Sequence, residues 1–324
     1  MKKEKQHTIL KMNQLGKAKR PFVFLIDFDF QKPLIFEWEE SKQHLLWQTP
    51  KQSNFTPRET TISKFNWKVL PVYYGRYQKA FDLIQHHLHN GDSYLLNLTM
   101  PSKIETELSL EEVFQISTAP YKILLKNQFV CFSPEIFIRI ENGEISSFPM
   151  KGTIDANLEN AAFILKNDNK ELAEHNTIVD LIRNDLSMVA DHVQVEKYRY
   201  LDHIKSNRNE LLQMSSQISG KLTDNYNEQL GDLIAKLLPA GSISGAPKKK
   251  TVEIIKEAEK YERGYYTGIF GVFDGENLDS CVLIRYLEQQ NNQLVFKSGG
   301  GITFQSTCKN EYEELVKKVY VPLA

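Results

Sequence analysis

An Asn-Gly pair at Asn142-Gly143 is the feature that most restricts how this chain of 324 residues can fold. Both residue types tolerate a positive φ, which a two-residue hairpin turn of type I′ requires, so the pair is the strongest short hairpin signal in the sequence. Segments rich in apolar residues flank it, at 136–141 and 145–149. The pair therefore predicts two antiparallel strands and favours a fold built largely of antiparallel sheet.

Further strands and helices are expected from local patterns. Runs of aromatic and aliphatic residues that end at turn signals predict strands over 22–30, 34–38, 93–99, 121–132, 267–273, 281–288 and 294–298. Helical periodicity predicts helices over 75–89, 109–116, 169–189, 229–237, 247–262 and 310–319. Two stretches rich in Ser, Gln, Thr, Gly or Pro, 48–64 and 239–247, are typical of loops.

These elements predict one α+β domain of antiparallel sheets with helices packed on them, because no internal repeat and no clear linker divides the chain. Residues 1–20 are polar and lysine-rich and predict a flexible N-terminal arm, which leaves 21–324 as the folded domain. Hydrophobic residues make up 41% of the chain, as expected for a protein with a substantial core.

Charge and hydropathy argue against two classes of partner. The 40 Lys and Arg residues are balanced by 41 Asp and Glu residues, so no basic excess is present to bind a nucleic-acid backbone. The apolar run 22–26 is far shorter than a membrane span, and the polar opening 1–6 is not a signal peptide. Cys131, Cys281 and Cys308 lack metal-ligand spacing and fit a reducing compartment. We therefore expect a cytoplasmic protein that binds neither nucleic acid nor membrane.

Two pairs of glutamates have a spacing that allows a metal site. Glu171 and Glu174 are three residues apart in one predicted helix, and Glu311 and Glu314 are three apart in another. Residues at this spacing share a helix face. If the two faces meet, four carboxylates form an oxygen-rich pocket suited to Mg²⁺. From the spacing alone, two solvated acidic faces are the simpler interpretation.

Three further segments have residue types found at anion sites. The small-residue stretch 241–248 runs into a helix start, where free amides and the helix dipole favour an anion, although a flexible connector fits equally well. Gly299, Gly300 and Gly301 follow a predicted strand, which favours close approach of a ligand to the backbone. Arg285 lies within a predicted apolar strand and needs an anionic partner, either a substrate carboxylate or a structural ion pair.

Taken together and in order, several blocks resemble the chorismate-utilising enzymes, among them the anthranilate, aminodeoxychorismate, isochorismate and salicylate synthases. The blocks are Ser133-Pro134-Glu135, Lys151-Gly152-Thr153, the run 174–186, the stretch 241–248, the run 263–268, Ile284-Arg285, 299–302 and 311–314. The resemblance covers roughly residues 90–320. It implies the fold of that family, with antiparallel sheets packed on each other and helices outside.

Within this family the residue before Gly-Thr separates two reactions. Anthranilate synthases typically carry Ala there and aminodeoxychorismate synthases typically carry Lys, so Lys151 points to aminodeoxychorismate synthase component I. Such a transferase converts chorismate and ammonia into 4-amino-4-deoxychorismate, the step toward 4-aminobenzoate and folate. The resemblance also implies a glutamine amidotransferase partner that supplies the ammonia. The alternatives are an anthranilate synthase large subunit and a catalytically silent relative that binds chorismate or the amidotransferase only.

The resemblance implies two catalytic residues and a Mg²⁺ site. Lys151 would attack C2 of the ring as a free amine, with its pKa lowered by burial and by the metal ion. Glu135 would act as general acid and protonate the departing 4-hydroxyl. The Mg²⁺ ion would bind the ring carboxylate and be held by four carboxylates, those of Glu171, Glu174, Glu311 and Glu314.

The resemblance also implies a set of substrate-binding residues. Arg285, Tyr266 and the amides near Gly245 and Gly300 would hold the enolpyruvyl carboxylate. The other members of the set are Thr153, Gln213, Ser242, Gly299, Gly301 and Lys318.

Three positions depart from the family pattern. Ile136 stands where an Arg usually follows Ser-Pro-Glu, Gln213 where a His is expected, and Gln305 where an Asp usually precedes Ser306. The N-terminal region is shorter than in typical relatives and has no match to the tryptophan-binding motif of anthranilate synthases. Tryptophan is therefore not expected to bind.

Overall fold

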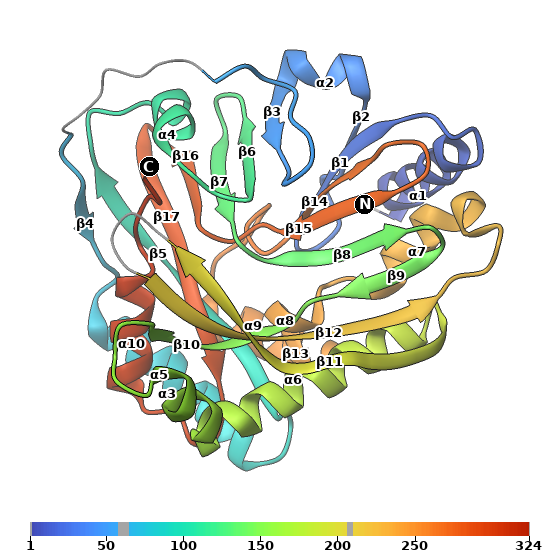
Figure 1. Cartoon of the computed structure of the whole chain (residues 1–324). Coiled ribbons are helices and arrows are strands. Elements are labelled where there is room, and N and C mark those ends of the chain that lie inside the picture. Colours follow the sequence, from blue (N-terminus) through green and yellow to red (C-terminus); the bar gives the residue numbers. More distant parts are fainter. Residues whose placement is uncertain (1, 58–64, 206–209, 324) are drawn as a thin grey trace.

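Strands from all parts of the chain form two sheets in the computed structural model, which describes residues 2–57, 65–205 and 210–323 (Figure 1). Helices cover these sheets, so the fold is the predicted α+β arrangement of antiparallel sheets flanked by helices. Of the predicted loop 48–64, the part 58–64 lies outside the described residues.

Counted over the described residues, the first sheet has nine strands, all paired antiparallel. In spatial order they are β10 (Met150–Asp155), β12 (Glu210–Lys221), β9 (Glu144–Ser147), β8 (Ile136–Glu141), β15 (Leu278–Val282), β14 (Ile269–Phe273), β1 (Phe22–Ile26) and β2 (Leu34–Glu37), with β11 (Asp191–Lys205) paired to β12.

The second sheet has eight strands on the same count, again all antiparallel. In spatial order they are β13 (Gly245–Ala246), β5 (Leu95–Glu105), β17 (Gln293–Ile302), β16 (Tyr286–Gln290), β7 (Phe129–Ser133), β6 (Tyr121–Leu125) and β3 (Leu45–Gln48), with β4 (Lys68–Leu70) paired to β5.

The α-helices in the described part of the chain are α1 (Lys2–Lys17), α2 (Trp38–His44), α3 (Tyr74–His89), α4 (Leu110–Ile116), α5 (Ala161–Asn167), α6 (Asn169–Ser187), α7 (Leu230–Leu237), α8 (Gly241–Ser244), α9 (Lys248–Glu259) and α10 (Cys308–Lys317). Figure 1 shows α1 and α7 together at one end of the molecule, away from α3, α5 and α10. Within the described residues, none of the helices has both the length and the apolar composition that crossing a membrane requires.

Alternation in β1 divides the core between the two faces of the first sheet. Val23 and Leu25 point into the layer between the sheets, where they join Trp47 of β3. Phe24 and Ile26 point to the other face and belong to the core that contains residues of α1, α6 and α7. Because both faces of the strand are buried, its sequence is a continuous apolar run, and the two sheets pack face to face.

The Asn-Gly turn is confirmed, and two other hairpins refine the prediction. Asn142 and Gly143 have positive φ values of 52° and 78° and join β8 to β9. Asn127, with φ of 61°, turns the chain between β6 and β7, so the stretch predicted as one strand over 121–132 is a hairpin. The long hairpin of β11 and β12 is not predicted by local patterns.

The N-terminal segment differs from the predicted flexible arm. Residues 2–17 form α1, and Ile9, Met12 and Leu15 of this helix are buried. These residues are three apart, so they form one apolar stripe, and the helix packs against α7. The polar composition that suggested an arm belongs to the exposed face of a docked helix.

Candidate active site

A cavity of about 500 Å³ forms where β10 of the first sheet and β17 of the second come together, with α6, α8 and α10 around it. Nearly every residue that the family resemblance assigns to the site lies on its wall, and these are Glu135, Lys151, Thr153, Glu171, Glu174, Gln213, Ser242, Tyr266, Arg285, Gly299, Gly300, Gly301, Glu311, Glu314 and Lys318. Gly245 does not line it. Of the departures from the family pattern, Ile136 and Gln213 lie on the wall and Gln305 does not.

Lys151 enters the cavity from an irregularity in β10. The strand pairs with β12 at Met150 and again at Thr153, with two residues of β10 opposite one residue of β12 in between. This is the pattern of a β-bulge, which bends a strand and redirects its side chains. Gly152 has a positive φ of 82° at the bulge, and a Cβ atom there would lie 3.1 Å from Glu171 Oε2. The bulge therefore brings the lysine and the acidic face of α6 together.

The ammonium group of Lys151 is paired with Glu174. Nζ lies 3.1 Å from Glu174 Oε2, and the two side chains are 24% and 10% exposed. Burial lowers the pKa of Lys151, but the charges of Glu174, Glu171 and Glu314 outweigh burial and raise the net pKa above its ordinary value. The residues of the protein thus favour the ammonium form of Lys151, so the predicted lowering of its pKa depends on the charge of the metal ion.

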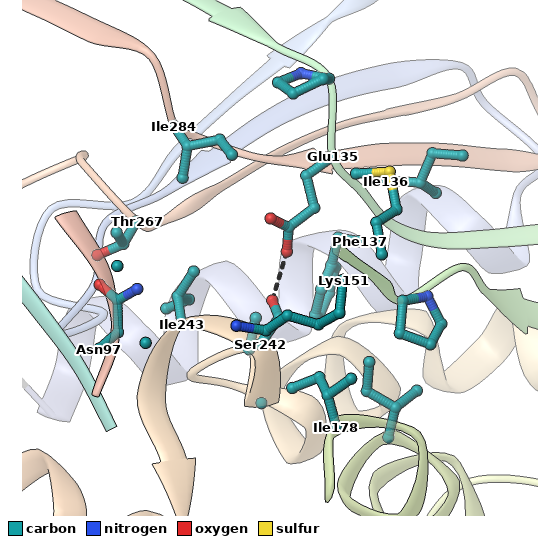
Figure 2. Close-up of a pocket in the computed structure, with 18 of the residues that line it drawn as sticks. Asn97, Glu135, Ile136, Phe137, Lys151, Ile178, Ser242, Ile243, Thr267 and Ile284 are labelled. Carbon is teal, nitrogen blue, oxygen red and sulfur yellow. Dashed lines mark hydrogen bonds between the residues drawn. The ribbon is translucent and has the colours of Figure 1, made fainter. Parts of the chain in front are cut away.

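Glu135 points into the cavity from the turn after β7, and Figure 2 shows its carboxyl group directed at Ser242. Ser242 Oγ donates a hydrogen bond to Glu135 Oε1 at 2.5 Å. Burial raises the pKa of Glu135, and the Ser242 hydrogen bond and the charges of Lys151 and Lys318 offset this only in part. A carboxyl group in this environment is suited to general acid chemistry.

The four predicted metal ligands come from two helices and line the same cavity, Glu171 and Glu174 from α6 and Glu311 and Glu314 from α10. Glu174 contacts Lys151, and Glu314 Oε1 lies 2.6 Å from Lys318 Nζ. The described residues hold no group of three or more acidic, His or Cys side chains already gathered for a metal ion. The oxygen donors fit Mg²⁺ in their chemistry, but two of the four are engaged by lysines.

Arg285 lies between β15 and β16, and not within one long strand as its apolar neighbours predict. Its φ is 55°, and this left-handed residue separates the two strands. The guanidinium lies 4.4 Å from the ring centre of Tyr320. Arg285 has no carboxylate partner within the part of the chain that the structure describes, so its fork of donors is available to an anionic group in the cavity.

The three consecutive glycines continue β17 instead of following a strand, and their surroundings differ. A Cβ atom at Gly299 would lie 2.2 Å from a backbone oxygen of β5, so the sheet itself requires this glycine. Cβ atoms at Gly300 and Gly301 would lie 3.3 Å from Glu314 Oε1 and 3.1 Å from Lys151 Nζ. Gly300 and Gly301 therefore leave room for the charged groups of the cavity.

The stretch 241–248 is not an open anion-binding loop. Its first part forms the short helix α8, and Gly245 pairs with β5 as part of β13. A Cβ atom at Gly245 would lie 1.8 Å from the Leu95 carbonyl oxygen. This glycine allows backbone to pack on backbone, which corrects the substrate contact predicted for its amide.

Two further residues at or beside the cavity, Lys248 and Asn97, are not singled out by the sequence analysis. Lys248 Nζ lies 2.8 Å from Asp185 Oδ2 of α6 and donates a hydrogen bond to the Leu237 carbonyl oxygen at 2.9 Å. Lys248 starts a run of three lysines, a pattern typical of a solvated face. Asn97 also lines the cavity, and its buried Oδ1 accepts no hydrogen bond from the described residues. A lone amide in the apolar run 95–98 is the signal that could have identified it.

Comparisons with known proteins agree on one family. A family model described as chorismate binding enzyme matches residues 8–324. An uncharacterised PabA-like protein of Haemophilus influenzae is 51% identical over 98% of this chain and 97% of its own length. Aminodeoxychorismate synthase component 1 of Bacillus subtilis is 29% identical over 87% of this chain and 61% of its own length. The solved structure of an isochorismate synthase, DhbC from Bacillus anthracis, shares the fold, with a TM-score of 0.73 at 19% identity over 96% of this chain and 87% of that one.

Proposed function

We propose that this chain, which belongs to the chorismate-binding enzyme family, is component I of an aminodeoxychorismate synthase. The observation that carries this proposal is the position of Lys151, whose amine enters the cavity from a bulge and lies 3.1 Å from Glu174 Oε2. In that position a lysine can act as a nucleophile toward a ring bound in the cavity. The residue type at this position is the one expected of enzymes that place an amino group at C4.

The first half of the reaction forms a covalent adduct. The neutral amine of Lys151 attacks C2 of chorismate, both ring double bonds shift by one position toward C4, and the bond between C4 and the hydroxyl oxygen breaks. Glu135 gives its proton to the departing oxygen, so water leaves and Glu135 becomes a carboxylate. The adduct is a secondary ammonium on a ring carbon.

The second half of the reaction releases the lysine. Ammonia attacks C4, both double bonds shift back, and the electron pair of the bond between C2 and nitrogen returns to Lys151. The new ammonium group at C4 loses one proton to the Glu135 carboxylate, which restores the general acid. The net change is chorismate plus ammonia to 4-amino-4-deoxychorismate plus water, with both catalytic groups regenerated.

Several charged groups support substrate binding in this proposal. Arg285, which has no acidic partner in the described part of the chain, would receive the enolpyruvyl carboxylate beside Tyr266. The glutamates of α6 and α10 would hold Mg²⁺. When bound, Mg²⁺ supplies positive charge that favours the neutral amine of Lys151 and attracts the ring carboxylate.

The proposal includes a partner and a compartment. The Cys and His residues of this chain form no recognisable glutaminase set, and ammonia would therefore come from a glutamine amidotransferase, as the PabA-like name of a relative suggests. The cytoplasm is the compartment in which we expect the two proteins to meet.

A single assay tests the proposal. The purified protein is incubated with chorismate, Mg²⁺ and ammonium, with and without a lyase that converts 4-amino-4-deoxychorismate to 4-aminobenzoate. We expect 4-aminobenzoate only when the lyase is present. Fluorescent anthranilate formed without the lyase would identify an anthranilate synthase, and the absence of both products from a folded, chorismate-binding protein would identify a silent relative.

A further inference from the structure

Ser242 contacts the proposed general acid and makes no other side-chain hydrogen bond to a described residue. Its hydroxyl donates to Glu135 Oε1 across the cavity, as Figure 2 shows. A serine hydroxyl has one proton to donate. Since the described residues offer it one acceptor, donation to the carboxyl group is the arrangement that satisfies both groups.

The other carboxyl oxygen of Glu135 is left for the substrate. Oε2 accepts no hydrogen bond from the described residues, and Figure 2 shows this oxygen pointing away from Ser242, toward the side of the cavity with Ile284 and Thr267. Because Oε1 receives the serine proton, the acidic proton of a neutral Glu135 is favoured on Oε2. Glu135 lines the cavity, so Oε2 is the oxygen left for a group that binds there.

The backbone around Ser242 is fixed by packing and by ionic contacts. Its neighbour Ile243 is buried, and the backbone amides of Ile243 and Ser244 donate to the Ala240 carbonyl oxygen at 3.3 and 3.1 Å. The pair of Lys248 with Asp185, described above, ties the end of this segment to α6. A hydroxyl held this firmly can determine the orientation of the carboxyl group that it contacts.

We propose that Ser242 is a positioning residue that holds Oε1 of Glu135 and thereby places the acidic proton on Oε2, facing the leaving hydroxyl of the substrate. The proposal rests on the proposed function, in which Glu135 protonates that hydroxyl. It replaces the direct substrate contact that the family resemblance implies for Ser242.

The charges around Glu135 give the direction of the expected pH effect. Lys151 of β10 and Lys318 after α10 favour the carboxylate form, as does the hydrogen bond from Ser242 of α8, while burial favours the neutral form. Cys281 of β15, a further titratable neighbour, is a buried thiol with a pKa well above its ordinary value and stays neutral. Removal of the Ser242 hydroxyl therefore raises the pKa of Glu135 further.

The first test compares the variants Ser242→Ala, Ser242→Thr and Ser244→Ala in the assay for 4-amino-4-deoxychorismate. For Ser242→Ala we expect kcat to fall about 10- to 100-fold, part of what a general acid contributes, with KM for chorismate within about twofold. In the profile of kcat against pH, the limb that reports loss of the Glu135 proton should move to higher pH. Threonine should restore most of the rate, and Ser244→Ala, a matched change on the same short helix, should leave the profile unchanged.

The second test needs no turnover. Infrared difference spectra follow the carboxyl band of Glu135, identified as the band lost in Glu135→Gln, against pH. We expect its midpoint to rise in Ser242→Ala and to stay in place in Ser244→Ala and Ser242→Thr. If the midpoint rises in Ser242→Ala but the wild-type protein forms no 4-amino-4-deoxychorismate, the proposed function is refuted while the contact between Ser242 and Glu135 is supported. An unchanged midpoint, or a raised KM with an unchanged kcat profile, would overturn the positioning role.

Discussion

Two ion pairs near the cavity differ in how completely their charges are satisfied. Arg263 and Glu259 are 2% and 1% exposed, and the guanidinium bonds both carboxylate oxygens, at 2.7 and 2.9 Å. It also donates to the backbone oxygen of Asn97 at 2.7 Å, while Glu259 accepts from the amide and the hydroxyl of Thr99. Lys151, in contrast, has one carboxylate partner at 3.1 Å in the described residues.

The difference indicates a structural role for the pair of Arg263 with Glu259 and a chemical role for Lys151. A buried pair with every donor and acceptor in use has nothing left for a ligand, and losing either partner exposes the other as an uncompensated charge. A lysine with one contact, on the wall of a cavity, can exchange that contact for a substrate atom. The two pairs therefore predict opposite results when they are broken: lost stability for one and lost activity for the other.

Removal of the cavity lysine should have the largest effect. Lys151→Ala should reduce the formation of 4-amino-4-deoxychorismate by about 10⁴-fold, which corresponds to about 5.5 kcal/mol in the barrier, because it removes the nucleophile. The melting temperature should stay within about 2 °C of the wild type, since the residue is on a cavity wall. Lys166→Ala, an exposed lysine of α5 outside the cavity, is the control. Near-normal turnover in Lys151→Ala would contradict a chemical role for Lys151 and the contrast drawn between the two ion pairs.

Removal of one partner of the buried pair should give the next largest effect, on stability. Glu259→Gln leaves the Arg263 charge buried without its carboxylate and should cost about 3–5 kcal/mol in the free energy of unfolding. Urea unfolding measures this loss. Glu253→Gln, on the exposed face of the same helix, should change stability by less than about 0.5 kcal/mol. Equal stability for the two variants would contradict a structural role for the buried pair.

The carboxylates of the cavity should provide a smaller and ligand-dependent effect. In the wild type, Mg²⁺ at ten times its Kd should stabilise the protein by about 1.4 kcal/mol, measured as a thermal shift without substrate. Glu174→Gln and Glu314→Gln should lose this shift, because each removes an oxygen ligand. Glu313→Gln, beside Glu314 on α10 but outside the cavity, should keep it. If both cavity variants keep the full thermal shift with Mg²⁺, these glutamates are not metal ligands and belong to solvated helix faces.

A buried lysine that has no carboxylate partner among the described residues should show the smallest effect and the opposite pKa change. Lys122 is 6% exposed and donates to the Ser117 carbonyl oxygen, and burial lowers its pKa to about 8. Between pH 8 and about 10.4 the unfolded chain binds more protons at this residue than the folded protein does, so stability should rise with pH there. Lys122→Met should lack this rise, of about 1 kcal/mol after allowance for solvent screening.

The control for this prediction is Lys126→Met, an exposed lysine at the end of the same strand hairpin. Urea unfolding of both variants and the wild type is compared at pH 7 and pH 10. If Lys122→Met shows the same change with pH as the wild type and the control, the pKa of Lys122 is not lowered in the folded protein.

Local patterns in the sequence predict most elements whose signal is contained within a few residues. Asn142-Gly143 requires positive φ values, and the hairpin is found there. The capping serine and the two glutamates of 109–112 give a helix start with a complete capping box at Ser109 and Glu112. The fold class follows from the same signals, because antiparallel hairpins and amphipathic helices leave few other arrangements.

Features that depend on distant partners could not be predicted in this way. Ile9 of α1 packs closely against Gly231 of α7, where a Cβ atom would lie 2.4 Å from the Ile9 carbonyl oxygen, and no local pattern shows that contact. Arg285 interrupts a run of apolar residues that would otherwise continue as one strand. Most residues that the resemblance assigns to the site line one cavity, but the pairing of Lys151 with Glu174 arises from a bulge and a helix, which no local pattern indicates.

The central claim is that Lys151 forms a covalent bond to chorismate, and intact-protein mass spectrometry tests it most directly. The protein is mixed with chorismate and Mg²⁺ without ammonia, quenched rapidly and weighed. Because no acceptor displaces the lysine, we expect a gain equal to chorismate minus one water, located by digestion in the peptide that contains Lys151. Lys151→Ala should bind chorismate without the gain in mass. Turnover with ammonia in a wild-type protein that never shows the added mass would contradict the account.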